Sequence, residues 1–197
     1  MKKSFLLTLA MMIAFGAMAQ FGLGIKAGPN FASQNSSGGD PGFEPDFKNI
    51  TALHAGIYMN YFFGETVGIQ PEILFSQKGS KVQDIDLENK LTYIDIPILL
   101  RFQFLEILNI HAGPQFSFLT SAKSVYSGGS FDIKDDLKSL ETSLAFGAGV
   151  DLPLRLNVTA RYIIGLTNIA DDTDFDDIEL KNSMFQLSLG FRIIGDR

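Results

Sequence analysis

The sequence predicts an all-β protein: an eight-stranded antiparallel up-and-down transmembrane β-barrel, preceded by a cleaved signal peptide. Apolar and polar residues alternate with period two in eight segments, which is the side-chain period of a β-strand. The connections between these segments are alternately short and long, as in a barrel with turns at one end and loops at the other. A short apolar segment with a basic head opens the chain, as in exported proteins.

The N-terminus has the three parts of a secretory signal peptide. A basic head over 1–3 is followed by an apolar stretch over 4–15 and an Ala-Met-Ala cleavage motif over 17–19. We expect the mature chain to begin at Gln20, so that 20–197 form one outer-membrane barrel domain. An N-terminal membrane anchor is the alternative, but the apolar stretch is shorter than the roughly 20 residues that a spanning helix needs.

The composition excludes several kinds of site. The 197 residues include no Cys, so the chain has no disulfide framework, thiolate metal site, Cys nucleophile or lipoprotein anchor. The net charge is −6 and no basic cluster occurs, which argues against nucleic acid as a partner. No later stretch reaches the roughly 18 consecutive apolar residues of a membrane helix. An exported soluble protein and an outer-membrane barrel are left.

The first four predicted strands lie at 21–31, 51–63, 67–79 and 91–104. In each strand one parity is apolar and the other is small or polar. In the first strand, for example, Leu23 and Ile25 alternate with Gly24 and Lys26. The polar parity of these four strands includes Lys26, Asn30, His54, Asn60, Gln70, Glu72, Ser76, Asp95, Arg101 and Gln103.

The last four predicted strands repeat the pattern, at 110–118, 143–151, 155–166 and 185–193. Their polar parity includes His111, Gln115, Ser117, Asp151, Arg155, Arg161, Gln186, Ser188 and Arg192. The short connections are 64–66, 105–108 and 152–154, and the long polar ones are 32–50, 80–90, 121–139 and 167–181.

The composition of the polar parity indicates which face meets lipid. This face is rich in Gly, Ser, Asn and Gln and carries only a few spaced charges, whereas a face in water normally carries more Lys and Glu. An eight-stranded barrel has an interior just wide enough for side chains to fill. We therefore expect the apolar parity to face lipid. The alternative is a soluble lipocalin-like barrel, whose apolar parity would face inward to bind a small apolar ligand.

A lumen filled by paired charges follows from this orientation, because buried charges are tolerated only when they are paired and hydrogen-bonded. Glu72 is expected to be ion-paired with at least one of Arg161, Arg101 or Lys26. The predicted lumen charge network consists of Lys26, Glu72, Asp95, Arg101, Asp151, Arg155, Arg161 and Arg192. The predicted polar lumen residues are His54, Gln70, His111 and Gln186.

Prolines interrupt four of the predicted strands. Proline cannot donate to the ladder, and a closed barrel has no edge strand to hold it. Bulges or local kinks are therefore expected at Pro29, Pro71, Pro97 and Pro114.

No enzymatic, metal or cofactor site is predicted. Two histidines alone make no metal site, and the strand carboxylates are not at ligand-like spacing. A third reading is a lipid-modifying outer-membrane enzyme, because His111 and Ser117 share a parity and could form a dyad. No G-x-S-x-G elbow supports this reading.

An acidic run near the C-terminus has a partial resemblance to a calcium loop. The Gly and Glu that an EF-hand needs at its sixth and twelfth positions are replaced by Asp177 and Ser183, so an EF-hand is excluded. We expect a solvated extracellular loop, with a loose divalent-cation bridge to lipopolysaccharide as the alternative. The run contains Asp171, Asp172, Asp174, Asp176, Asp177 and Glu179.

The mature chain resembles a known family, the PorT-like or "porin family" small outer-membrane barrels of Bacteroidota. The resemblance rests on the opening G-I-K-A-G-P-N strand, the L-T-Y-I-D-I-P-I-L-L-R strand over 91–101, and the final L-S-L-G-F-R-I strand. The last strand also resembles the signal read by the barrel-assembly machinery, although four residues follow Ile193.

The resemblance implies an outer-membrane barrel without enzymatic chemistry, acting as a structural, binding or envelope-assembly component. The implied partners are outer-membrane lipid and lipopolysaccharide, the barrel-assembly machinery and an envelope protein that the sequence does not identify. A crowded lumen of eight strands also predicts a barrel that is not a wide pore.

Overall fold

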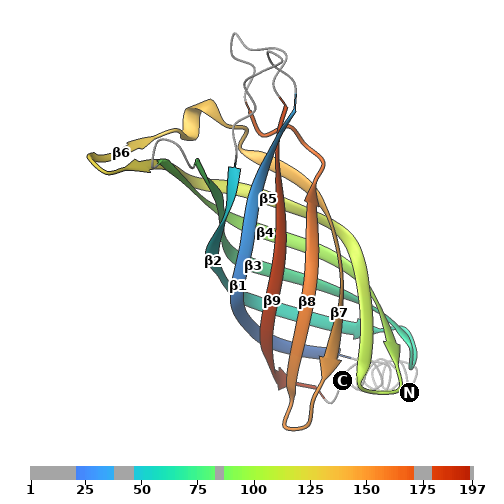
Figure 1. Cartoon of the computed structure of the whole chain (residues 1–197). Coiled ribbons are helices and arrows are strands. Elements are labelled where there is room, and N and C mark those ends of the chain that lie inside the picture. The colour runs from blue at the N-terminus through green and yellow to red at the C-terminus, as the bar shows by residue number, and fades with distance from the viewer. Residues whose placement is uncertain (1–20, 38–46, 83–86, 171–178, 196–197) are drawn as a thin grey trace, which may run out of the picture.

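The computed structural model describes residues 21–37, 47–82, 87–170 and 179–195, which form an antiparallel β-barrel (Figure 1). Within this part of the chain, no helix is long and apolar enough to cross a membrane. The elements are β1 (Phe21–Ser37), β2 (Phe47–Phe62), β3 (Val67–Val82), β4 (Leu87–Phe104), β5 (Leu108–Tyr126), β6 (Gly129–Asp132), the 3-10 turn η1 (Lys134–Asp136), β7 (Leu140–Asp151), β8 (Leu156–Gly165) and β9 (Glu179–Ile194).

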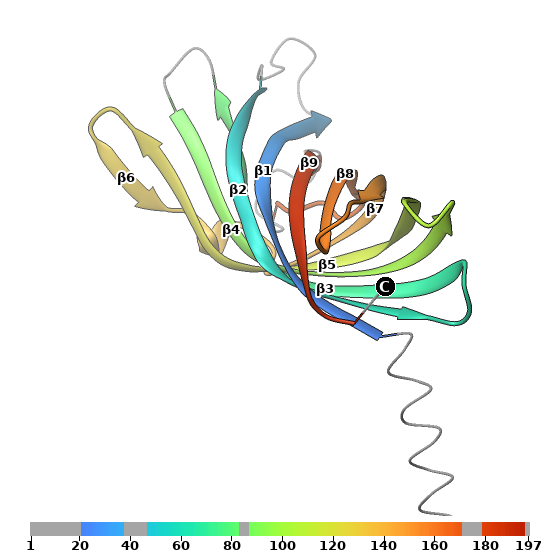
Figure 2. The same ribbon diagram turned by 90° about the horizontal axis from the view of Figure 1, so that it is seen from below.

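The strand order is that of a closed meander. Each barrel strand pairs with its neighbours in the chain, β9 pairs back with β1, and the order β4-β3-β2-β1-β9-β8-β7-β5 is closed by pairing of β4 with β5. Seen from below, the strands surround a common interior (Figure 2). The predicted eight-stranded up-and-down barrel is therefore confirmed. An additional short strand, β6, pairs with the outer end of β5 and projects away from the barrel (Figure 1).

The barrel wall is longer than the sequence predicts. Strand β1 continues to Ser37, and β3 and β4 continue to Val82 and from Leu87, so much of 32–50 and 80–90 is paired strand and not loop. The apolar alternation stops where the strands leave the lipid-facing band. Their backbone pairing continues, because a strand in water needs no apolar outer face. A strand can therefore continue beyond the point where its apolar alternation ends.

The two faces of the barrel wall settle the orientation. Outward apolar side chains are exposed, with Leu53 63%, Ile73 50% and Leu189 57% accessible. Inward charged side chains are buried, and Glu72 and Arg161 are only 2% and 1% accessible. The lipocalin-like alternative is therefore wrong, since its apolar face would be inside.

The apolar outer face has the height of a membrane. On β3 it runs from Val67 to Phe75, nine residues, which at about 3.3 Å per residue and a tilt of about 40° covers about 23 Å. Aromatic side chains mark its edge, where Phe31 of β1 lies 6.3 Å from Phe185 of β9 between ring centroids. The next outward positions are hydroxyl or amide residues: Ser33, Thr51, Gln77, Thr92, Thr120, Thr142 and Ser183.

The four strand prolines do not shift the register, so the bulges, one of the two expected outcomes, do not form at them. The pairs Pro71↔Ile98 and Leu74↔Asp95 keep one register across the intervening residues of β3 and β4, and Pro97 of β4 is likewise followed by no register change. The register shifts recorded lie between Leu23 and Gly24, between Asn49 and His54, and between Thr92 and Tyr93. Each proline loses a ladder bond, and the pairs on either side hold the strands in place.

Candidate functional site

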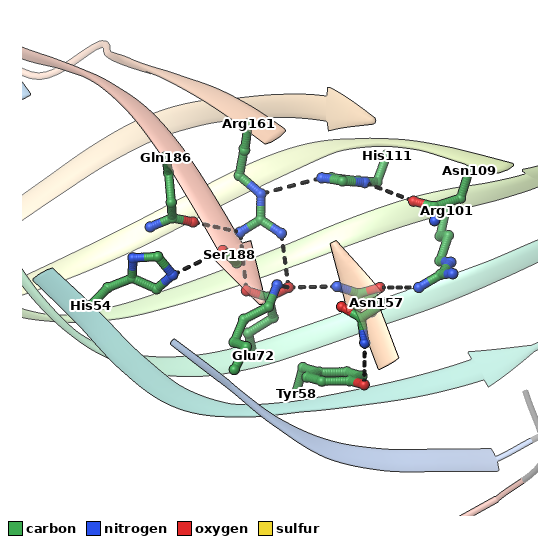
Figure 3. A network of polar contacts seen from close by, with 12 residues as sticks. His54, Tyr58, Glu72, Arg101, Asn109, His111, Asn157, Arg161, Gln186 and Ser188 are labelled. Atoms are coloured by element: carbon green, nitrogen blue, oxygen red, sulfur yellow. Dashed lines mark hydrogen bonds and ion pairs between the residues drawn. The ribbon is translucent and has the colours of Figure 1, made fainter. Parts of the chain in front are cut away.

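A buried ion-pair network fills the centre of the barrel (Figure 3). Arg161 donates to both carboxylate oxygens of Glu72, with Nη2–Oε1 at 2.8 Å and Nη1–Oε2 at 3.0 Å. Lys26 Nζ lies 2.9 Å from Glu72 Oε1. One carboxylate thus accepts from two cations, and a bidentate guanidinium pair is among the strongest arrangements available to buried charges.

The central pair crosses the barrel. Glu72 lies on β3 and Arg161 on β8, and four strand steps separate these two strands in either direction around the wall. The side chains therefore come from opposite sides of the lumen and meet inside it. Both alternate with outward apolar residues, Glu72 between Pro71 and Ile73, so the period of the strands alone directs them inward.

A neutral histidine accepts a hydrogen bond from the Nε of Arg161. The Arg161 guanidinium donates from Nε to His111 Nε2 at 3.3 Å, and His111 Nδ1 lies 3.2 Å from Asn109 Oδ1. A guanidinium can only donate, so Nε2 accepts and the proton is on Nδ1. Gly147 pairs with both His111 and Arg161 on the neighbouring strands. A Cβ at Gly147 would lie 2.9 Å from Arg161 Cα and 3.0 Å from His111 Nε2, so the contact depends on glycine.

A second part of the network lies toward the short turns. Arg101 pairs with the carboxylate of Asp151 and donates to Gln70 Oε1 at 2.9 Å. Arg101 Nη2 and Gln103 Nε2 both donate to Asp151 Oδ2, the latter at 3.0 Å. Arg192 Nη2 lies 3.5 Å from the other Asp151 oxygen. Asp151 is therefore shared by two arginines.

Arg155 is not part of the lumen network, which corrects the prediction. It is exposed, it occupies the turn between β7 and β8, and its Nη1 donates to the backbone carbonyl of Ile193 at 3.1 Å. Strand β8 begins at Leu156, so Arg155 has the correct parity but lies one residue outside the strand.

An apolar cluster also lies inside the lumen. On β8 Ile163 is the next inward position after Arg161, and on β9 Met184 is the next after Gln186. These side chains pack together with others from the surrounding wall. The buried members are Ala32, Ile50, Leu99, Ala145, Ile163 and Met184.

The lumen contains a second charged cluster, of which only Asp95 and Ser117 are expected from the sequence. Lys78 Nζ lies 3.2 Å from Asp95 Oδ1 and 3.5 Å from Glu141 Oε2, and it donates to Ser117 Oγ at 3.0 Å. The ammonium also lies 4.5 Å from the centre of the Tyr93 ring, within cation–π range. Lys78, Asp95 and Glu141 are all buried.

The parity of the strands could have identified the missed residues. Lys78 stands two positions after Ser76, and Glu141 stands two positions before Ser143, so both continue the inward parity. Glu141 lies outside the predicted strand at 143–151. Tyr58 is a further inward residue, whose hydroxyl accepts a bond from Asn157 Nδ2 at 2.6 Å.

The His111–Ser117 dyad that the lipid-modifying alternative would need does not form. His111 contacts Arg161 and Asn109, while Ser117 accepts from Lys78. A different contact joins His54 Nε2 to Ser188 Oγ at 2.8 Å, and both side chains are buried. Among the described residues no group of three or more His, Asp or Glu could hold a metal ion.

The acidic run falls mostly outside the described residues, so Asp171, Asp172, Asp174, Asp176 and Asp177 have no structural account here. Glu179 is the first residue of β9, and its backbone pairs with Ser37 of β1.

The fold and the membrane-height apolar band are those of an outer-membrane protein, and a family comparison agrees. A family model described as an outer membrane protein beta-barrel domain matches residues 14–171. The chain belongs to this family. It is an outer-membrane protein, and its apolar band contacts the lipid and lipopolysaccharide of that membrane. The short turns of such barrels face the periplasm and the opposite end faces the exterior.

Solved outer-membrane barrels have a similar structure. Neisserial surface protein A is 10% identical with a TM-score of 0.55, covering 86% of this chain and 96% of its own. OprG from Pseudomonas aeruginosa is 11% identical with a TM-score of 0.54, covering 90% and 98%. Ail of Yersinia pestis is 16% identical with a TM-score of 0.49, covering 87% and 99%. The comparison with curated proteins found no match. At such identities the likeness concerns the fold.

Proposed function

We propose that this small envelope barrel acts through its surfaces, as a structural, binding or envelope-assembly component of the outer membrane. The Arg161–Glu72 pair carries this proposal, because it joins opposite walls of the lumen at bonding distance. The apolar cluster around Ile163 and the Lys78 cluster also occupy the interior. A barrel filled in this way is suited to rigidity and to presenting its outer end, and not to passing solutes.

We also propose that the protein is not an enzyme. The one His–Ser contact among the described residues, between His54 and Ser188, is buried in the packed lumen. His54 Nδ1 has no hydrogen-bond partner within the described part of the chain, so no acid orients the ring as a catalytic triad requires.

The finer assignments are proposals of the same kind. We propose a PorT-like member of the Bacteroidota barrels, on the strength of the stretch over 91–101, whose Asp95 and Arg101 both point inward. We propose that residues 1–19 are a cleaved signal peptide and that 20–197 are inserted by the barrel-assembly machinery. A further envelope protein as partner is consistent with the exposed β5–β6 hairpin.

Conductance tests the proposed function. The purified protein in planar bilayers is expected to give no large, stable openings, because the central ion pair and the other buried side chains of the lumen leave no continuous water path. Liposome swelling in a five-carbon sugar should likewise equal that of empty liposomes, with a wide porin as the positive control. Reproducible openings that pass sugar-sized solutes would contradict the proposal.

A further inference from the structure

The short-turn end of the barrel contains a pocket of about 580 Å³, within the usual size of small-molecule sites. The β2–β3, β4–β5 and β7–β8 turns all line it, so it occupies the periplasmic mouth. Its lining includes three guanidinium groups, from Arg101, Arg155 and Arg192.

One buried donor at this pocket has no acceptor among the described residues. Asp151 is the carboxylate between the arginines, and it already accepts from Arg101 and Gln103 and from Asn109 Nδ2 at 3.3 Å. Arg192 reaches Asp151 only at 3.5 Å, and its Nε is buried with no hydrogen-bond partner among the described residues. A buried guanidinium N–H without an acceptor is costly, so a ligand that brings an acceptor to Arg192 would be favoured.

Arg155 is held at the pocket by a strained turn. Both Leu154 (φ 62°) and Arg155 (φ 64°) are left-handed, and so are Leu105 (φ 49°) and Glu106 (φ 61°) in the β4–β5 turn. Two-residue turns of this kind favour Asn-Gly, because other side chains resist positive φ. Strain of this sort clusters at functional sites. In the β7–β8 turn this conformation keeps the guanidinium of Arg155 at the mouth of the pocket.

Two acidic residues also line the pocket without satisfying the buried donors. Glu65 and Glu106 lie in turns and are exposed, so solvent and salt screen their charges. The unmatched Nε of Arg192 is buried. The two exposed glutamates therefore weaken anion binding less than the buried arginine favours it.

We propose that the periplasmic mouth binds a phosphate-bearing anion, held by Arg155 and Arg192 with Arg101 behind them. This inference goes beyond the proposed function. Guanidinium groups match phosphate oxygens in bidentate geometry. Leu105 and Leu154, 83% and 84% accessible, also line the pocket and add an exposed apolar rim. A phospholipid headgroup and a soluble phosphate share this chemistry.

The test is calorimetric titration of the full barrel in maltoside micelles at constant ionic strength in chloride. One arm uses inorganic phosphate and the other uses dihexanoyl phosphatidylglycerol. Arg155→Gln and Arg192→Gln are each expected to weaken binding about tenfold, the loss of one charge-assisted hydrogen bond. Lys123→Gln removes one positive charge at the opposite end of the barrel and should bind as wild type.

The arms separate the two sources of phosphate. Saturable binding of inorganic phosphate supports a soluble ligand, and saturable binding of the lipid alone supports a headgroup. Arg155 is exposed in a turn, so its variant should keep the heat-modifiable migration of a folded barrel. Absence of saturable binding in both arms would overturn the proposal. Equal affinity of the wild type and both arginine variants would also overturn it.

Discussion

Replacing Glu72 with alanine is expected to lower the free energy of unfolding by about 3–5 kcal/mol, because removal of one partner of a buried pair leaves an uncompensated charge. In this barrel two cations lose their partner at once, since both Arg161 and Lys26 bond Glu72. The matched control is Glu88→Ala. Glu88 is partly exposed and forms a 3.5 Å pair with exposed Lys90, so its loss should cost less than about 1 kcal/mol.

Urea unfolding in detergent micelles, followed by the heat-modifiable gel shift, measures both variants. A double variant, Glu72→Ala with Arg161→Ala, should be less destabilised than the sum of the two single variants, because residues in direct contact are coupled. If Glu72→Ala and Glu88→Ala were both as stable as wild type, the Glu72 network would contribute nothing to the barrel.

Replacing Lys78 with alanine is expected to lower the free energy of unfolding by a similar amount, about 3–5 kcal/mol. The substitution leaves Asp95 and Glu141 buried together without their shared cation, and it removes the ammonium from the Tyr93 ring. Lys90→Ala is the control, because Lys90 has a side chain 55% exposed.

The same urea titration tests whether the two charged clusters are independent. Glu72 and Lys78 have different ion-pair and hydrogen-bond partners among the described residues, so the effects of Glu72→Ala and Lys78→Ala should add when combined. A Lys78→Ala variant no less stable than Lys90→Ala would show that the cluster of Lys78, Asp95 and Glu141 carries no buried charge.

The alternation of residues was enough to predict the barrel, because a closed sheet must direct alternate side chains to opposite sides. Glu72 and Arg161 were predicted as inward residues on that ground, and Glu72 was expected to have a cationic partner. Parity does not give the height of a side chain along the barrel axis. Whether Glu72 of β3 and Arg161 of β8 meet across the lumen depends on the shear of the whole barrel, which no local sequence feature encodes.

The errors arose at strand ends. Arg155 has inward parity but lies in a turn with positive φ, and Glu141 lies in a strand beyond the predicted boundary. The strands outlast the apolar pattern that was used to delimit them. The prolines were expected to require bulges, yet Pro71 and Pro97 only interrupt a ladder whose flanking pairs keep its register.

Spin-label accessibility tests the central claim, that the apolar face meets lipid and the charged face is sealed inside. The chain contains no Cys, so single-cysteine variants carry one label each. Labels at Leu53, Ile73 and Leu189 in proteoliposomes should be accessible to oxygen, which concentrates in lipid, and shielded from a water-soluble nickel complex. Collisions with the nickel complex at these three positions, at the rate found for a label in the exposed β5–β6 hairpin, would contradict the account.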